Sequence, residues 1–131
     1  MAAAESYPDD LKYHREHDWA RIDGDEAVLG ITWFAQDALG ELVHYEPPQA
    51  GQQVAKDSSY GEVESVKAVS DVIAPLSGEV LEVNAQVIDA PETVNEDPYG
   101  NGWLIRVRIA DPGEADALLD VGAYRELLAD Q

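Results

Sequence analysis

The sequence contains no cysteine and few basic residues. Among its 131 residues there are 8 Lys plus Arg against 27 Asp plus Glu, so the formal net charge is −19 at pH 7. Without cysteine the chain can form no disulfide, no thiolate nucleophile and no Cys-ligated metal site. The acidity disfavours nucleic acid and anionic membranes as partners, because both require basic patches. It is compatible with steering of basic partners, with salt adaptation, or with solubility alone.

Long apolar runs are also missing. No stretch approaches the roughly 20 residues that a membrane-spanning helix needs, and the start of the chain resembles neither a secretory signal nor an Arg-rich transit peptide. We therefore expect a cytoplasmic protein with no membrane partner. The length and a hydrophobic content of 45% predict one compact domain. We interpret residues 1–10 as a loose N-terminal lead and 11–131 as the domain.

Short β-type segments, with helices at the margins, make up most of the chain. Strands are predicted at 19–22, 26–31, 42–45, 51–54, 60–66, 68–74, 79–84 and 103–110. Thr32 is predicted as the N-cap of a helix over 33–39, which Gly40 ends. Gly61-Glu-Val63 recurs as Gly78-Glu-Val80, which suits two similar hairpins packed face to face. The pattern predicts a mainly β fold, either a small sandwich or a barrel.

Three further segments have a distinctive pattern. Residues 89–102 are rich in turn-forming residues and are too long for an idle loop, which indicates a functional or packed Ω-loop. In 103–110, apolar residues alternate with Arg106 and Arg108, whose side chains are predicted on a solvated face. The C-terminal tail is predicted to be helical, with a break at Gly122.

Conventional catalytic constellations are nearly absent. The sequence has no G-x-S-x-G motif, no Gly-rich phosphate loop and no H-E-x-x-H motif. His14, His17 and Asp18 could form an acid–base cluster, but no nucleophile accompanies them, so surface residues at a strand entrance are the favoured interpretation. Glu62 and Glu64 are predicted on the wet face of a strand. No metal site and no catalytic residue is predicted.

Lys67 is the residue whose context indicates a function. The β-type runs 60–66 and 68–74 flank it, so its side chain is predicted at the tip of a hairpin, displayed away from the body. A post-translational attachment point needs such an exposed amine on a rigid platform. Edge and turn lysines also commonly serve only to keep sheets soluble. Lysine is scarce in this chain, and acids such as Glu64 and Asp71 surround this one, which strengthens the attachment hypothesis.

The residues around Lys67 belong to a pattern that extends over most of the chain. Around the lysine it consists of Glu64-Ser65-Val66-Lys67-Ala68, Ser70-Asp71 and Ala74-Pro-Leu-Ser-Gly-Glu-Val80. Elsewhere it comprises Tyr13 to Trp19, Gly30-Ile31-Thr32, Ala35-Gln36, Leu39-Gly40, Glu82-Val-Asn84, Pro91-Glu92, Asn95 to Gly100, Gly102-Trp103, Leu118-Leu119 and Tyr124. The combination, over roughly residues 11–130, resembles the glycine cleavage system H protein, a lipoyl carrier.

The resemblance implies a fold and a role. The fold is a flattened barrel-sandwich of the lipoyl/biotinyl type, with a short helix in the N-terminal half and helices at the C-terminus. The role is that of a carrier and not of an enzyme. Such a carrier accepts an aminomethyl group from glycine decarboxylase (P protein) and passes it to aminomethyltransferase (T protein). Dihydrolipoyl dehydrogenase (L protein) then reoxidises it.

The resemblance also implies the site. Lys67 would carry lipoic acid through an amide, attached by a lipoate ligase or lipoyl transferase. The residues that flank it are Glu64, Ser65, Val66, Ala68 and Asp71. Asp18 and Asp71 are the candidates for a pocket that holds the cationic aminomethyl group, with surface solubility as the alternative. A cofactor that brings its own sulfur suits a chain without cysteine, and tethering delivers its cargo at high effective concentration.

Some positions depart from the family pattern, and some alternatives remain. The departures are Asp18, Trp33, Phe34, Ala38, His44 and Pro47, all outside the attachment hairpin. A biotin carrier would flank its lysine with methionines, whereas Val66 and Ala68 stand here. A lipoyl domain of a 2-oxo acid dehydrogenase would have Asp before the lysine and no closing helices. An H-like protein that relays lipoyl groups to other lipoate-dependent enzymes, and an unmodified acidic interaction domain, stay open.

Overall fold

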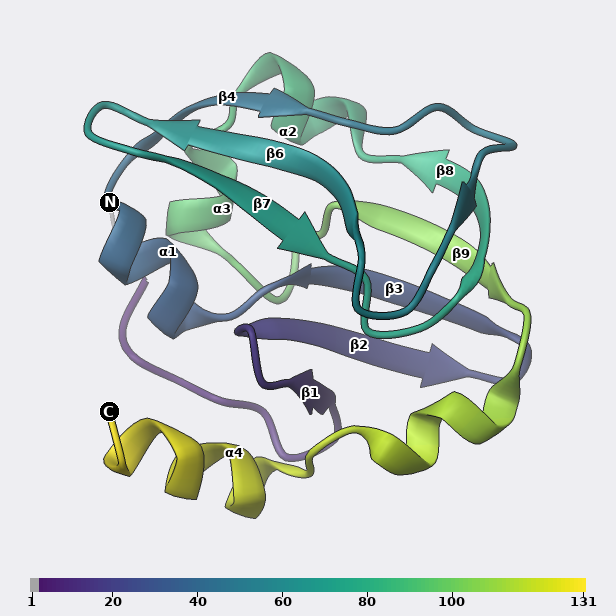
Figure 1. Ribbon diagram of the computed structural model, residues 1–131. Coiled ribbons are helices and arrows are strands. Elements are labelled where there is room, and N and C mark those ends of the chain that lie inside the picture. Colours follow the sequence, from purple (N-terminus) through teal and green to yellow (C-terminus); the bar gives the residue numbers. More distant parts are fainter. Residues whose placement is uncertain (1–2) are drawn as a thin grey trace.

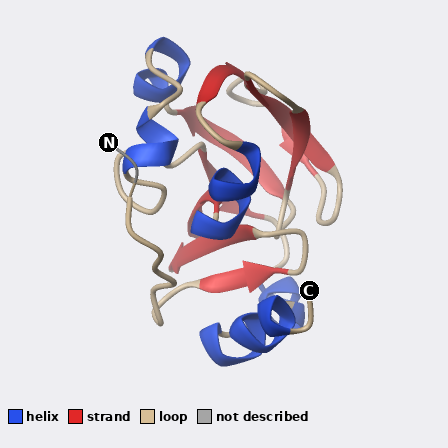
Figure 2. Ribbon diagram, turned by 90° about the vertical axis from the view of Figure 1, so that its left-hand side faces the viewer, coloured by secondary structure: helices blue, strands red, loops and turns tan. Residues whose placement is uncertain are grey.

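Two antiparallel sheets face each other in the computed structural model, which describes residues 3–131 (Figures 1 and 2). The larger sheet has the strand order β1-β2-β3-β9-β8-β5, and the smaller has the order β4-β6-β7. The strands are β1 (Lys12–His14), β2 (Asp18–Asp23), β3 (Glu26–Ile31), β4 (Leu42–Glu46), β5 (Gln53–Val54), β6 (Ser59–Ser65), β7 (Val69–Ile73), β8 (Gly78–Val83) and β9 (Ile105–Ile109). The predicted mainly β sandwich is confirmed.

The first helix, α1 (Trp33–Leu39), has the bounds that the sequence predicts. The hydroxyl of Thr32 accepts a hydrogen bond from the amide of Ala35, and the amide of Gly40 donates to the carbonyl of Gln36. Gly40 has a φ of 84°, a left-handed conformation that glycine adopts without a steric cost. Both helix ends are therefore fixed by local chemistry.

The turn-rich stretch 89–102 is packed, and it contains helical turns that the sequence does not predict. Helix α2 (Ala85–Asp89) ends at its beginning, and α3 (Thr93–Glu96) lies within it. The buried amide side chain of Asn95 donates to Gln36 and to the carbonyl of Gly40, and it accepts from the amide of Leu42. These bonds join the stretch to α1 and β4.

The predicted helix break at Gly122 is wrong. The tail forms a 3₁₀ helix, η1 (Pro112–Ala117), and then α4 (Val121–Ala129), with Gly122 inside α4. The break comes earlier because the backbone of Leu119 exchanges two hydrogen bonds, each of 2.8 Å, with Tyr13 of β1. Asp120 then starts α4 by accepting a bond from the amide of Ala123.

The space between the sheets holds the main core. Its larger buried members include Leu29, Leu42, Tyr45, Val63, Val72, Leu76, Leu104, Ile105 and Val107. Arg106 and Arg108 point the other way, as predicted, and form ion pairs with glutamates on the outer face of the larger sheet. A second cluster lies between that sheet and α4, and its buried members are Tyr7, Leu11, Tyr13, Trp19, Tyr99 and Tyr124.

The segment 3–10, expected as a loose lead, forms no helix or strand but is held against the body. The side chain of Tyr7 is buried, and the carbonyl of Ser6 accepts a hydrogen bond of 2.6 Å from the hydroxyl of Tyr99. The indole of Trp33 donates to the carbonyl of Ala3. Trp33 and its neighbour Phe34 are only partly exposed and pack into the second cluster, and the ring of Phe34 lies 4.5 Å from that of His17.

Candidate functional site

Lys67 lies in the turn between β6 and β7, at the tip of an extended hairpin (Figure 1). The hydroxyl of Ser65 accepts hydrogen bonds from the amides of Lys67 at 3.2 Å and Ala68 at 3.1 Å. The amide of Ser65 donates to the carbonyl of Ala68 at 2.8 Å. Ser65 is buried, whereas Val66, Lys67 and Ala68 are exposed. A fixed turn thus presents a free side chain.

The hairpin that carries this turn is well anchored. Val63 of β6 is buried and pairs with Tyr45 of β4 and with Ser70 of β7, so the middle of the hairpin packs on the core. Glu62 and Glu64 on either side of Val63 are exposed, which confirms their predicted place on the wet face. The platform is therefore rigid below an exposed tip.

The lysine side chain passes close to the end of α1. A Cβ atom placed on Gly40 would lie 3.7 Å from the Cε of Lys67. Gly40 also lines a shallow cavity of about 300 Å³ between α1 and α3. The other lining residues are Gln36, Asp37, Glu41, Glu92, Asn95 and Glu96. The sequence does not predict this acidic neighbourhood, which α3 completes.

Asp18 is buried and is joined to the same hairpin. Its carboxylate accepts a hydrogen bond of 3.1 Å from the amide of Ile73, at the end of β7, and only 2% of its surface is exposed. Burial raises the pKa of this carboxyl group well above its ordinary value, against the effect of the Ile73 amide, which lowers it. Asp18 therefore favours the neutral form far more than an exposed aspartate does.

Asp71 is the other predicted pocket residue, and it is exposed. It lies on β7 two residues before Ile73 and opposite Glu62 of β6. Its carboxylate accepts a hydrogen bond of 3.2 Å from the hydroxyl of Ser59. Asp18 and Asp71 thus belong to neighbouring parts of the structure, one buried behind the end of β7 and the other on its surface.

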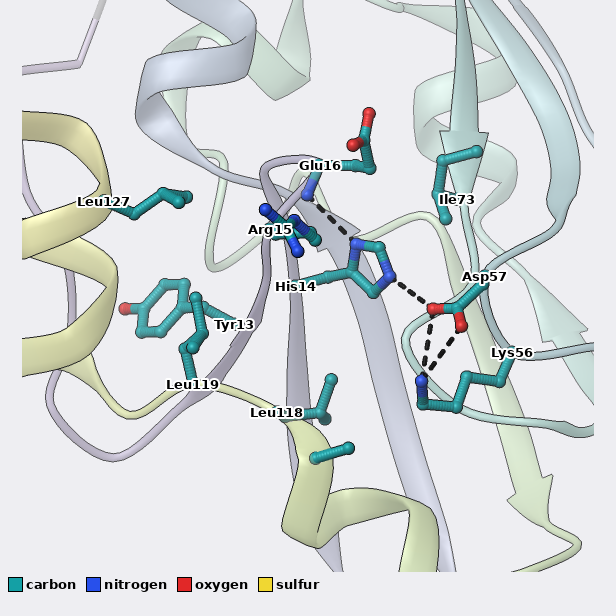
Figure 3. A pocket seen from close by; sticks show the side chains of 11 residues that line it. Tyr13, His14, Arg15, Glu16, Lys56, Asp57, Ile73, Leu118, Leu119 and Leu127 are labelled. Atoms are coloured by element: carbon teal, nitrogen blue, oxygen red, sulfur yellow. Dashed lines mark hydrogen bonds and ion pairs between the residues drawn. The ribbon is translucent and has the colours of Figure 1, made fainter. Parts of the chain in front are cut away.

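A groove of about 740 Å³ opens beside Ile73, at the base of the hairpin (Figure 3). The other residues that line it are Tyr13, His14, Arg15, Glu16, Lys56, Asp57, Ala117, Leu118, Leu119 and Leu127. In its wall, Nε2 of His14 lies 2.6 Å from a carboxylate oxygen of Asp57, which also accepts from Lys56. The hydrogen bonds from His14 and Lys56 lower the pKa of Asp57.

His14, His17 and Asp18 do not form an acid–base cluster. Nδ1 of His14 accepts from the amide of Glu16, so its Nε2 donates to Asp57. Nδ1 of His17 faces the hydroxyl of Tyr124 at 2.8 Å, and Asp18 faces the Ile73 amide. The interpretation as surface residues is also wrong, because His14 and Asp18 are buried. Each holds a different segment of the fold.

Two polar features of this region have no signal in the sequence. His14 and Asp57 are 43 residues apart, and only the folded chain brings them together. The hydroxyl of Tyr60 is buried without a hydrogen-bond partner within residues 3–131. In the same part of the chain, no group of His, Asp or Glu side chains could hold a metal ion, and no helix is long and apolar enough to cross a membrane.

A lysine at the tip of an exposed hairpin, on a body of two facing β-sheets and without a catalytic constellation, defines a carrier domain of the lipoyl/biotinyl type. The family model of the glycine cleavage H-protein matches residues 11–131. The chain therefore belongs to the glycine cleavage H-protein family.

Individual relatives agree with this assignment. The glycine cleavage system H protein of Halorhodospira halophila is 54% identical over 125 residues, which cover 95% of this chain and 96% of the relative. That of Carboxydothermus hydrogenoformans is 51% identical over 124 residues and 95% of each chain. The crystal structure of an H protein from Mycobacterium marinum matches with a TM-score of 0.87 at 42% identity, over 94% of this chain and 99% of that one.

The family fixes the role of the chain. An H protein is the non-catalytic lipoyl carrier of the glycine cleavage system, and it moves between the P, T and L proteins. The expected role in glycine catabolism is confirmed, and the relay of lipoyl groups to other enzymes is not favoured. The family carries covalently attached lipoate.

Proposed function

We propose that Lys67 is the residue that carries the lipoyl group, through an amide bond between its Nζ and the carboxyl group of lipoic acid. The exposed position of its side chain at the tip of the hairpin supports this proposal most directly. The ε-amine takes part in no ion pair among residues 3–131, so no internal partner competes for it. The residues present fit an amide-linked group.

The surrounding residues have distinct roles in this proposal. Ser65 holds the turn, and Glu64, Val66, Ala68 and Asp71 form the surface that an attaching enzyme reads. That enzyme is a lipoate ligase or a lipoyl transferase, in the cytoplasm. When bound, the lipoyl group supplies the disulfide and dithiol chemistry that a chain without cysteine lacks.

Asp18 and Asp71 are the residues that we propose to hold the cationic amine of the aminomethyl cargo. Lys67 and Asp71 are four residues apart, or roughly 13 Å along a strand, and an extended lipoyl-lysine side chain has a comparable length. Asp18 lies just beyond, at Ile73. An ammonium group at this place favours the charged form of Asp18, so the buried carboxyl would ionise as the cargo arrives.

Intact mass spectrometry tests the attachment site. The protein, expressed with its own attaching enzyme, should carry one lipoyl group. Lys67→Arg should abolish the adduct, because a guanidinium is a poor acyl acceptor, while Lys12→Arg, a matched change at another exposed lysine, should retain it. An adduct that persists in the Lys67→Arg variant would overturn the assignment. Fully lipoylated protein should support glycine decarboxylation with its own P protein.

The pocket needs a separate test. In lipoylated protein loaded by the P protein, Asp71→Asn should shorten the lifetime of the aminomethyl cargo in solution about tenfold, because an amide stabilises an ammonium group less than a carboxylate does. Asp116→Asn, a change at an exposed aspartate of η1, is the control. Equal lifetimes would remove Asp71 from the pocket and leave Lys67 as the carrier residue.

A further inference from the structure

Exposed apolar side chains gather around Lys67. Three of the large hydrophobic residues that stay exposed lie at this end of the small sheet, namely Val66 at 79%, Val69 at 60% and Val43 at 49%. Val66 is in the turn, Val69 begins β7, and Val43 lies on β4 at the level of the turn. Because burying apolar surface is favourable, such a group marks a surface that a partner covers.

The outer face of the same sheet is acidic. The strand register places Glu46, Glu62 and Asp71 side by side on β4, β6 and β7, and all three are exposed. Glu64 lies two residues after Glu62 on β6, so its exposed side chain is on the same outer face. Among the ion pairs of residues 3–131, none includes Glu62, Glu64 or Asp71, whereas Glu46 lies 3.1 Å from Nε2 of His44, a pair that is ionic only when the histidine is protonated. Like charges opposite each other on adjacent strands destabilise a sheet, so folding alone does not favour this arrangement.

The larger sheet provides an internal comparison. On its outer face Arg106 forms ion pairs with Glu26 at 2.7 Å and Glu82 at 3.0 Å, and Arg108 forms one with Glu79 at 3.5 Å. Arginines thus balance the acids of the larger sheet, whereas the small sheet has only the pair of His44 with Glu46 among residues 3–131 and no arginine partner for its acids. An adaptation to salt, or to solubility alone, would place excess acid on the outer faces of both sheets. It therefore does not explain the difference between the two faces.

Acylation increases the difference. Lys67 is the lysine at this end of the small sheet, and amide formation removes its charge, which takes the formal net charge from −19 to −20. The carboxylates of Glu62 and Glu64 then face solvent beside the three valines with no ammonium at the tip. The lipoylated carrier therefore presents a more acidic face than the carrier with a free lysine.

We propose that this surface docks on glycine decarboxylase, against Arg and Lys side chains that surround an apolar depression. The surface, named the arm-side face, comprises Val43, Glu46, Glu62, Glu64, Val66 and Val69. The inference rests on the proposed role of Lys67. The T protein meets a cationic cargo, whereas the decarboxylase meets an uncharged disulfide. Recognition by the decarboxylase therefore depends most on the surface around the arm.

Steady-state kinetics with charge variants test this docking. Glu46→Gln combined with Glu62→Gln removes two charges from the arm-side face. Asp116→Asn combined with Glu126→Gln removes two from the C-terminal segment, at the opposite side of the molecule in Figure 1. All proteins are fully lipoylated, as checked by intact mass. The first variant should raise the KM of glycine decarboxylase for the carrier about tenfold at low salt, with kcat unchanged. The control should change KM less than twofold.

The salt dependence and the valines give independent readouts. The KM of the wild-type carrier should rise with ionic strength, and that of the Glu46→Gln/Glu62→Gln variant should rise less steeply. Val43→Ser combined with Val69→Ser should raise KM even in high salt, because an apolar contact is not screened. Carrier with an unmodified Lys67 should compete for the decarboxylase with the lipoylated form, but more weakly than equal affinities of the two forms would predict.

Each contrary result overturns a definite part. If the arm-side and control variants raise KM equally, the acidity acts only through net charge and the docking surface is wrong. If the arm-side variant affects the T or L protein and leaves the decarboxylase unchanged, the choice of partner is wrong. If wild-type lipoylated carrier supports no decarboxylation, the proposed function itself fails, and this outcome is distinct from the other two.

Discussion

Ser65 determines how the hairpin presents Lys67. Its hydroxyl accepts hydrogen bonds from two backbone amides of the turn and lies 3.4 Å from the carbonyl oxygen of Ala68. One buried side chain therefore provides hydrogen-bond partners for several backbone groups of the turn. A lysine in a turn without this support would sample many backbone conformations. The enzyme that acylates Lys67 would then have to order the turn itself, at an entropic cost.

Ser65→Ala should therefore weaken both stability and modification. Loss of the acceptor should lower the free energy of unfolding by about 1 kcal/mol and slow lipoylation several-fold. Urea unfolding and the initial rate of lipoylation, followed by intact mass, measure the two effects. Ser58→Ala is the control, because Ser58 is exposed in the connection before β6. A normal lipoylation rate in Ser65→Ala would show that the turn needs no side-chain support.

Asp18 determines part of the pH dependence of folding. Its pKa is raised in the native state, so the native protein binds more protons than the unfolded chain once the pH exceeds the ordinary value of about 3.9. The stability contributed by Asp18 is therefore fully present below that pH and decreases as the pH rises through the native pKa. The cause is the burial of the carboxyl group behind β7.

Asp18→Asn should flatten this decrease. The amide oxygen can still accept from the Ile73 amide, and no charge is buried, so the variant should be more stable than the wild type at pH 7–8 and gain less on acidification. Urea unfolding between pH 4.5 and 8 measures the difference. Asp116→Asn should leave the wild-type profile unchanged. A variant less stable than the wild type at pH 8 would mean that the charged carboxylate is stabilised in the native state.

At the scale of elements, the two similar glycine motifs mark close approaches between strands. A Cβ atom on Gly61 would meet the carbonyl oxygen of Glu46, and one on Gly78 would meet that of Arg108. In both cases the obstacle is the backbone of a neighbouring strand, which cannot move without breaking the ladder. The sequence repeat therefore reflects strand packing, once in each sheet.

Gly78→Ala should consequently lower the free energy of unfolding by about 2 kcal/mol or more. Gly122→Ala provides the contrast, because Gly122 lies within α4 and a Cβ there would meet only an oxygen of Asp120 at 3.6 Å. That change should raise stability by about 0.5 kcal/mol, since alanine favours helix. Chemical denaturation measures both. Destabilisation by Gly122→Ala would show that this position of α4 requires glycine.

Elements set by local signals could be predicted from the sequence, and those set by distant contacts could not. Helix α1 was predictable to the residue because Thr32 and Gly40 fix its ends. Helix α3 was not, because it depends on Asn95 bonding to α1 and β4. The predicted break in the tail failed because Leu119 pairs with Tyr13, more than 100 residues away.

The candidate site divides in the same way. The position of Lys67 at a hairpin tip follows from two flanking β-type runs and from the motif around it. The groove at the base of the hairpin does not, because His14, Asp57 and the C-terminal leucines come from three distant segments. The burial of Asp18 was equally unpredictable, since an aspartate beside two histidines has the composition of a surface turn.

At the scale of the whole molecule, the charge has two consequences that can be separated. One is local, at the arm-side face, where Glu62 and Glu64 lack ion-pair partners among residues 3–131 and a positively charged enzyme surface is the expected complement. The other is global. Repulsion among 27 acids against 8 basic residues destabilises the compact state, which holds like charges closer together than the unfolded chain does.

Salt should therefore stabilise the protein. The range of salt concentration over which the free energy of unfolding rises distinguishes charge repulsion from salt adaptation. Screening lengths fall from about 30 Å at 0.01 M to about 8 Å at 0.15 M, so the free energy of unfolding should rise by about 1 kcal/mol up to 0.3 M NaCl and then level off. Sodium and potassium chloride should act alike, because screening depends on ionic strength. The lipoylated form, at −20, should show a slightly steeper rise. A stability that keeps rising into the molar range would instead indicate a surface adapted to high salt, and a flat profile below 0.3 M would show that the native fold already balances its charges.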